Sequence, residues 1–397
     1  MGTVQRMQQI SSLAQADRQV AAATAPRRFK YLNVPLLATV AVLVIYGLLV
    51  VYSAVAANEN YNFSRQVGGV AIGIALMLLL FRFDYHQLSH YLVLFLIINI
   101  VLIMSPHIPL IGQSANGATS WVGIGKVRFQ PGEFAKITVI LQAASVVSRY
   151  HGKLTDPRDF LKALALMLVP FVCIMTQPDL GTGMVYLFIA GVALLVSGAR
   201  PRYIAIVAGV LAGGIVALFL IDPIADAIAG HDVLLKNYQR ARLLVFLDNS
   251  YDTSGDGYNL RQAKIAVGSG GILGKGWMNA TQSTLGYLPE APTDFIFCVL
   301  GEQFGFVGAL ALLALYGLLI AIIYQIAYNA NDLFGTVLVM CAAGMWLFQI
   351  LENIGMDIGL MPITGIPLPF MSYGSSFMVV NFVMLGFIGS VWAHSGR

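Results

Sequence analysis

The chain has 397 residues, of which 58% are hydrophobic and only 11% are charged, and its mean hydropathy is +0.76. These values exclude an ordinary water-soluble protein. The net charge is +4, and we attribute it to basic cytoplasmic loops rather than to an acidic partner such as nucleic acid. The cysteines, Cys173, Cys298 and Cys341, fall in apolar stretches without metal or disulfide spacing, so redox chemistry is not expected.

Residues 1–33 are polar, Ala-rich and basic, and they lack the apolar core of a signal peptide, so we interpret them as a cytoplasmic tail. Apolar segments that approach the length needed to cross a ~30 Å hydrocarbon core then follow one another. They cover residues 34–56, 66–82, 88–105, 134–149, 161–177, 180–198, 203–221, 306–328, 333–352 and 374–394. The sequence therefore predicts an all-α polytopic membrane protein with about ten transmembrane helices. The fourth segment contains Gln142 and two serines, which suits a tilted, re-entrant or interior helix.

The distribution of basic residues predicts the orientation of the chain. Thirteen Lys and Arg residues fall in the tail, the inner loops and the C-terminus, against four at the short outer ends. The positive-inside rule then places both termini in the cytoplasm. Residues 34–397 would form one membrane domain with 222–294 as its large outer loop. Within that loop, 233–246 and 259–268 have the pattern of interfacial helices, and the Gly-rich stretch 268–276 predicts an irregular connection.

Asp294 ends a polar segment and immediately precedes an apolar run, which places its carboxylate at the outer membrane boundary. An apolar neighbourhood raises the pKa of a carboxylate and suits it to act as a general base. An aspartate at the start of a helix is also a common N-cap, so both roles stay open. Glu290 lies four residues earlier, but Pro292 intervenes, so a carboxylate pair cannot be assumed.

Two further polar clusters interrupt apolar regions. In Gln130-Pro-Gly-Glu133-Phe-Ala-Lys136, Glu133 and Lys136 stand three residues apart on one helical face, where they would pair with each other or contact a substrate. In the second cluster, Asp179 belongs to Gln-Pro-Asp-Leu-Gly-Thr-Gly, which suits either a tight turn or a functional site.

The outer loop also carries six basic residues that could bind a phosphorylated lipid or neutralise anionic head groups. They are Lys236, Arg240, Arg242, Arg261, Lys264 and Lys275. The connection 364–376 contains two prolines and two glycines as well as Ser372, and such non-helical backbone at membrane depth should line a cavity. No convincing P-loop, dinucleotide fingerprint, zinc-protease motif or Ser-His-Asp pattern is present.

Taken together, these segments resemble the SEDS family (shape, elongation, division and sporulation) over nearly all of residues 30–395. The resemblance rests on six motifs in the family's order. They are WVGIGKVRFQPGEFAK (121–136), QPDLGTG (177–183), YQRARL (238–243), GYNLRQAKIAVGSGGILGKGW (257–277), LPEAPTDFIF (288–297) and GIPLPFMSYGSS (365–376). The family often reads Ser-Tyr-Gly-Gly-Ser-Ser in the last motif, whereas here Ser375 stands in place of the second glycine. The sequences QAKIAVGSGG (262–271) and GIPLPF (365–370) resemble the elongation members more than the division members.

The resemblance implies a bacterial plasma-membrane glycosyltransferase that polymerises lipid II into glycan strands with a class B penicillin-binding protein. It assigns the catalytic aspartate to Asp294, and it places Glu133 and Lys136 near the substrate cavity and Arg240 and Lys264 in outer-loop motifs. Gln130, Asp179 and Ser372 belong to other matching motifs and are further candidates for substrate binding. Basic residues or a divalent cation, Mg²⁺ or Mn²⁺, would stabilise the pyrophosphate leaving group.

Two other functions would also explain ten spans with polar interruptions. A lipid II flippase should display polar residues through the whole membrane depth, whereas here the charged residues crowd toward the outer half. A non-catalytic scaffold for cell-wall enzymes would leave Asp294 as a helix cap only. The sequence thus favours chemistry at the outer face.

Overall fold

The computed structural model describes residues 32–56, 60–109, 111–115, 118–124, 127–177, 179–229, 240, 242, 244–246 and 255–395. The tail predicted for residues 1–33 lies almost wholly outside this part of the chain. Of the interfacial helix predicted at 233–246, only a few residues are described.

All ten predicted apolar segments coincide with helices. These are α2 (Val34–Ala56), α3 (Phe63–Arg82), α4 (Leu92–Met104), α5 (Pro131–Arg149), α6 (Pro157–Met175), α7 (Leu180–Val196), α8 (Pro201–Ala229), α12 (Ile296–Tyr328), α13 (Leu333–Ile358) and α14 (Ser375–His394). In the described part of the chain, α2, α3, α12, α13 and α14 are long and apolar enough to cross a membrane. The protein is therefore a multi-pass, mostly helical membrane protein.

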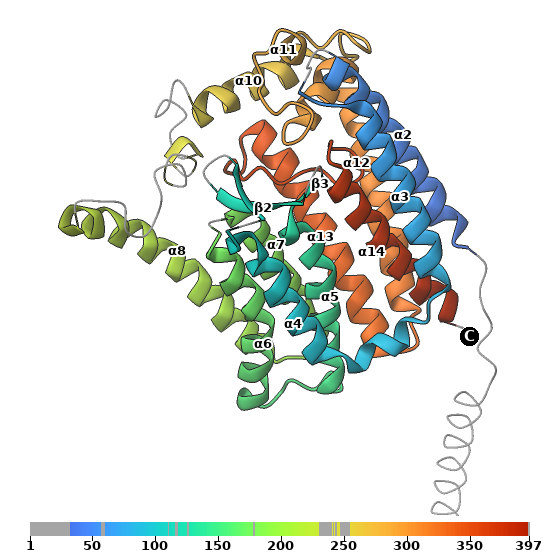
Figure 1. Cartoon of the computed structure of the whole chain (residues 1–397), viewed down its shortest axis with the longest axis vertical. Coiled ribbons are helices and arrows are strands. Elements are labelled where there is room, and N and C mark those ends of the chain that lie inside the picture. The colour runs from blue at the N-terminus through green and yellow to red at the C-terminus, as the bar shows by residue number, and fades with distance from the viewer. Residues whose placement is uncertain are drawn as a thin grey trace, which may run out of the picture.

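The helices form a bundle with α13 in its interior and with connecting elements gathered at one end (Figure 1). The helices α10 (Asp256–Ser269) and α11 (Thr281–Thr284) lie over this end, and α10 packs on α12 and α13. We call it the loop end. The short helices η1 (Tyr85–His90) and η2 (Ser105–His107) flank α4. In Figure 1, α8 diverges from the rest of the bundle.

The prediction of an all-α chain is wrong between α4 and α5. Three short antiparallel strands in the order β1-β2-β3 stand there at the loop end: β1 (Gly112–Ala115), β2 (Ala118–Ile124) and β3 (Val127–Phe129). Trp121 pairs with Gln113, and Val122 pairs with both Gly112 and Phe129. The sheet satisfies backbone groups of β2 on both sides and of β1 and β3 on one side, which reduces the unpaired backbone of a connection near the membrane. Their shortness and frequent glycines hid the alternation of strand residues in the sequence.

The helix predicted at 306–328 begins ten residues earlier, at Ile296, and is interrupted at Gly305. Gly305 has φ +62°, a value that glycine adopts without a steric penalty, and the interruption leaves backbone groups without helical partners. The Gly-rich connection 270–276 supplies them: Lys275 N–H donates to the Glu302 carbonyl (2.9 Å), and Phe306 N–H donates to the Gly271 carbonyl (2.9 Å). The irregular connection and the broken helix therefore complete each other's hydrogen bonds.

The Glu302 side chain, on α12, holds the same connection through hydrogen bonds. This fully buried carboxylate accepts hydrogen bonds from Lys275 Nζ (2.5 Å), from the Thr281 backbone N–H (2.9 Å) and hydroxyl (2.7 Å), and from Gln282 N–H (3.1 Å). Lys275, for which the sequence left phosphate binding and neutralisation of lipid head groups open, forms an ion pair with Glu302. Trp277 ties the connection to α2 by donating its indole N–H to the Leu49 carbonyl (3.1 Å).

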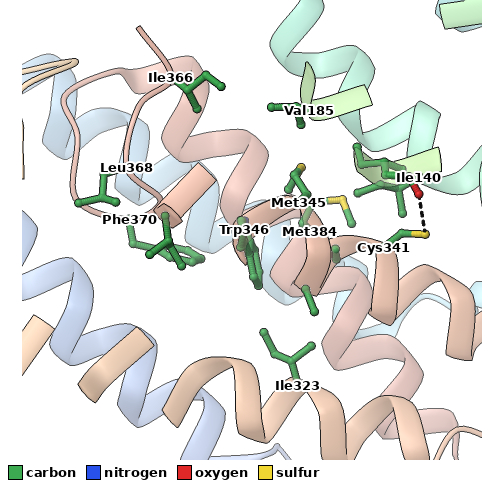
Figure 2. Close-up of a cluster of buried hydrophobic side chains, with 14 of the residues drawn as sticks. Ile140, Val185, Ile323, Cys341, Met345, Trp346, Ile366, Leu368, Phe370 and Met384 are labelled. Atoms are coloured by element: carbon green, nitrogen blue, oxygen red, sulfur yellow. Dashed lines mark hydrogen bonds between the residues drawn. The ribbon is translucent and has the colours of Figure 1, made fainter. Parts of the chain in front are cut away.

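The hydrophobic core is centred on α13 (Figure 2). Trp346 is fully buried, packs edge-on against Phe370 (5.2 Å between ring centroids) and donates its indole N–H to Asn381 Oδ1 (2.6 Å). Phe370 belongs to the connection between α13 and α14, so the core extends directly into the loop end. Elsewhere, α3 and α14 approach closely because Gly73 faces Phe382 without a side chain of its own.

We expect Glu302→Leu to lower the free energy of unfolding, because Lys275 and two backbone N–H groups lose their acceptor. The general cost of one buried unsatisfied group is about 1–3 kcal/mol. Thermal melting of detergent-purified protein should show a lower Tm for Glu302→Leu and a smaller loss for Glu302→Gln, which keeps an acceptor. Asp159→Asn removes an exposed ion pair with Lys162 and should leave the Tm nearly unchanged. Equal Tm values for Glu302→Leu and wild type would contradict the view that Glu302 stabilises this connection.

Candidate functional site

Asp294 lies at the loop end, in a turn that immediately precedes α12. The carbonyl of Glu290 accepts hydrogen bonds from the backbone N–H groups of Thr293 (3.1 Å), Asp294 (3.1 Å) and Phe295 (3.3 Å). Glu290 itself has φ +54°, an uncommon value for a residue other than glycine. The N-cap of α12 is Phe295, and no side chain caps this helix. The alternative that Asp294 serves as the N-cap is therefore wrong, and its carboxylate is left for another role.

Two residues from distant parts of the sequence hold Asp294 in place. Asn353, on α13, donates both to the Asp294 carbonyl (2.7 Å) and to the Ile366 carbonyl (2.8 Å), so it joins the turn to the α13–α14 connection. Gly365 lies directly against the carboxylate, because a methyl group at its Cα would stand 2.9 Å from Asp294 Oδ2. Gly365 also has φ +76°, so glycine is suited to this position both by its backbone and by its size.

The surroundings of Asp294 shift the pKa of its carboxyl toward neutral pH. Burial raises the pKa of its carboxyl to about 7, with a further increase from the negative charge of Glu290 and opposing effects from Arg242 and the Thr293 hydroxyl. Glu290 is exposed and accepts hydrogen bonds from the hydroxyls of Tyr61 (2.6 Å) and Thr293 (3.2 Å). The two carboxylates that the sequence left unpaired are thus electrostatically coupled, and Asp294 has the pKa of an effective general base at physiological pH.

Glu133 and Lys136 form an ion pair, which is one of the two alternatives that their spacing left open. Their Oε1 and Nζ atoms are 2.6 Å apart in the first turns of α5, and their side chains are only 8% and 2% exposed. Glu133 Oε2 is buried without a hydrogen-bond partner, and Lys136 Nζ stands 5.7 Å from the centre of the Phe377 ring on α14. The pair is therefore buried, with one carboxylate oxygen left for a further donor.

Gln130 and Asp179 link this ion pair to the surroundings of Asp294. Gln130 donates from Nε2 to Asp179 Oδ2 (3.1 Å), and Asp179 caps α7 by accepting from the Thr182 N–H (3.0 Å). Gly181, in the first turn of α7, packs against the α13–α14 connection, since a methyl group there would lie 3.2 Å from the Thr364 carbonyl. The first turn of α7 thus meets the connection that also contacts Asp294, and Gln130 joins the start of α5 to α7.

The other predicted site residues have local partners. Ser372 is buried, and its hydroxyl accepts from the Leu368 N–H (2.8 Å) within the α13–α14 connection. Arg240 is paired with the buried Asp222 on α8 through Nε (2.9 Å) and Nη2 (2.6 Å). Lys264, on α10, lies over Gly359 just beyond the end of α13. These contacts assign each side chain a structural partner, and their contact with substrate stays a prediction.

A cavity of about 720 Å³ lies between α3, α4, α5 and α14 and is mostly apolar. It is lined by Arg65, Gly68, Gly69, Ile72, Leu102, Arg128, Phe129, Phe134, Ile137, Thr138, Ser375, Ser376 and Val379. Arg65 lies in the first turn of α3 and Arg128 belongs to β3, so both cations lie toward the loop end. The cavity can accept a long apolar group with an anionic head.

Sequence reasoning missed two residues near Asp294 and gave too little weight to Arg242. Arg242 donates to the Thr364 carbonyl (3.3 Å) and acts electrostatically on Asp294, but nothing in the sequence distinguishes it from the other basic residues of its loop. Glu352 and Asn353 lie at the end of an apolar segment, where ionisable or amide side chains are already a signal of function. Among the described residues, no group of three or more His, Cys, Asp or Glu side chains is placed to hold a metal ion.

Comparison with protein families matches residues 31–396 to the family of FtsW, RodA and SpoVE, described as cell cycle proteins. A similar curated protein is the peptidoglycan glycosyltransferase MrdB of Escherichia coli K12, with 36% identity over 369 residues that cover 92% of this chain and 94% of MrdB.

Two solved structures have the same fold. One, from work on the structural coordination of polymerization and crosslinking by a peptidoglycan synthase complex, matches with a TM-score of 0.74 and 28% identity, covering 91% of this chain and 97% of the other. The second is the crystal structure of the rod shape determining protein RodA of Thermus thermophilus, with a TM-score of 0.65, 26% identity and coverages of 91% and 96%.

We expect single charge reversals in the buried ion pair, Glu133→Lys or Lys136→Glu, to reduce the yield of folded protein severalfold, because each leaves two like charges in a buried site. The swap that combines both reversals should recover much of that yield. Fluorescence-detected size-exclusion chromatography of the three variants measures the effect. If the swap recovers nothing beyond the single variants, contact with substrate rather than mutual pairing fixes these positions.

Proposed function

The chain belongs to the FtsW, RodA and SpoVE family, and on this premise we propose that it is a peptidoglycan glycosyltransferase that polymerises lipid II into β-1,4 glycan strands. The observation that carries the proposal is Asp294, a carboxylate at the loop end that caps no helix and has a pKa of about 7. A group with this pKa is substantially deprotonated near neutral pH and can still accept a proton efficiently.

In the proposed reaction, Asp294 removes the proton from the 4-hydroxyl of the acceptor GlcNAc as that oxygen attacks the anomeric carbon of the donor MurNAc. The bond from the anomeric carbon to the pyrophosphate oxygen breaks as the new glycosidic bond forms, so the configuration inverts from α to β. The electron pair of the broken bond leaves with the undecaprenyl pyrophosphate. Because pyrophosphate is a good leaving group, one carboxylate suffices and a general acid is not required.

The apolar cavity suits the polyprenyl tail of a lipid-linked substrate. Its walls are formed mainly by α3, α4, α5 and α14, and Arg65 and Arg128 stand where the pyrophosphate of such a lipid would lie. Glu133, Lys136, Gln130 and Asp179 belong to the neighbouring first turns of α5 and α7, and we assign them to the binding of the sugar and pyrophosphate groups. Arg240, Lys264 and Ser372 would support this region through the contacts described above. A divalent cation, Mg²⁺ or Mn²⁺, would assist charge stabilisation if one binds with the substrate.

We further propose that the loop end faces the outside of the plasma membrane, with ten transmembrane helices and both termini in the cytoplasm. The excess of basic residues at the opposite end of the helices supports this orientation. The partner would be a class B penicillin-binding protein, in keeping with the structural likeness to a peptidoglycan synthase complex. The amino-acid sequence of residues 262–271 and 365–370 supports a role in cell elongation, within a family whose name also covers FtsW and SpoVE.

We expect Asp294→Asn to fold normally and to abolish glycan polymer formation, because the amide cannot accept the proton of the attacking hydroxyl. Purified protein with its penicillin-binding partner and lipid II is assayed by gel separation of the glycan products. Asp159→Asn, at an exposed site on α6, is the matched control and should give polymer at the wild-type rate. Wild-type polymer yield from Asp294→Asn would overturn the assignment of the base.

The pKa of Asp294 predicts how the rate depends on pH. Because the base acts when deprotonated, kcat/KM should rise as the pH increases through about 7. Glu290→Gln removes a negative charge that raises this pKa, so the rise should move to lower pH; its side-chain carbonyl can still accept from Tyr61. Arg242→Gln removes a positive charge that lowers the pKa, so the rise should move to higher pH. Shifts in the same direction for both variants would refute the electrostatic account.

A further inference from the structure

Glu352 is a buried carboxylate near the site that the proposed reaction leaves without a role. It lies in the last turns of α13 and is only 1% exposed. Its Oε1 accepts a hydrogen bond from the hydroxyl of Thr364, and its Oε2 is buried without a hydrogen-bond partner. A buried acid with so few donors is costly to the fold. Stability therefore gives no reason for a glutamate at this position.

The residue that Glu352 holds is adjacent to the residue that contacts Asp294. Thr364 is followed by Gly365, whose Cα lies against the Asp294 carboxylate. The Thr364 carbonyl accepts from Arg242 (3.3 Å), and the Ile366 carbonyl accepts from Asn353 (2.8 Å). Glu352 is thus the side-chain anchor of a three-residue segment, 364–366, whose carbonyl groups are held by Arg242 and Asn353.

We infer that Glu352 is a positioning residue for the glycosyl transfer proposed above: by holding the Thr364 hydroxyl it fixes the backbone of Gly365 and, through it, the orientation of the Asp294 carboxylate. The inference rests on the proposed function of Asp294. Gly365 has φ +76° and no side chain to restrict it, so its conformation depends on its neighbours. Asp294 in turn needs a fixed orientation, because small displacements of a catalytic group reduce the rate strongly.

The chain offers a matched control on the same helix. Gln349 lies one turn before Glu352, is fully buried, and has neither side-chain polar atom hydrogen-bonded. Gln349→Leu therefore makes the same kind of change as Glu352→Leu, a buried polar side chain replaced by an apolar one, without touching Thr364. Glu352→Gln keeps an oxygen that accepts from the Thr364 hydroxyl and serves as the conservative variant.

Steady-state polymerisation with the penicillin-binding partner tests the inference. Glu352→Leu and Thr364→Val should each lower kcat by about tenfold or more, with KM for lipid II within about twofold of wild type. The double variant should be no slower than either single variant, because both remove the same hydrogen bond. Glu352→Gln and Gln349→Leu should stay close to wild type. The inference is overturned if Glu352→Leu keeps the wild-type kcat or if Glu352→Gln loses as much kcat as Glu352→Leu. It is also overturned if the fold-losses of the two single variants multiply in the double variant.

Hydrogen–deuterium exchange without substrate gives a readout that does not depend on the reaction. The backbone amides of the non-proline residues in 363–368 should exchange faster in Glu352→Leu and Thr364→Val than in wild type, and their exchange should be unchanged in Gln349→Leu. Unchanged exchange in Glu352→Leu would overturn the anchoring. If wild-type protein with an active partner makes no polymer, the proposed function fails by itself, and the exchange experiment still decides whether Glu352 anchors this segment.

Discussion

The loop end depends on one constraint: irregular backbone close to the membrane must find hydrogen-bond partners inside the protein. Three irregular segments meet there, and the backbone groups of each find hydrogen-bond partners in a different way. The connection 270–276 bonds the interrupted backbone of α12, the turn at 290–295 closes on the Glu290 carbonyl, and the connection after α13 is bonded by Asn353. Because Asn353 donates to carbonyls of both the turn and the connection after α13, the turn that carries Asp294 is fixed to that connection.

The same burial accounts for the chemistry proposed for Asp294. A site that excludes water so that backbone groups bond one another also removes water from a carboxylate, and desolvation is the largest cause of its raised pKa. Glu290 and Arg242 then adjust the pKa in opposite directions. The fold thus provides a base suited to neutral pH, and one carboxylate is enough for a leaving group that needs no protonation.

The sequence predicted all ten apolar helices and the Glu133–Lys136 pair, because hydropathy and helical spacing are local properties. It did not predict the strands β1–β3, because they are short and their glycines obscure the alternation of strand residues. It did not predict the break at Gly305, because the backbone partners of that break lie in the separate connection 270–276. For Asp294, local reasoning left a helix cap and a general base both open, and only the position of the helix start at Ile296 excluded the cap. The contact with Gly365, 71 positions away along the numbering, could not be seen in any local pattern.

The buried acids of the loop end differ in how many hydrogen bonds they accept. Glu302 receives several donors and joins two segments, which is what a structural carboxylate requires. Glu133 and Glu352 each retain a buried oxygen without a hydrogen-bond partner, a state that costs stability. Both stand beside the segments that contact Asp294 or adjoin it. Such costs are typical of sites where selection acts on activity rather than on stability.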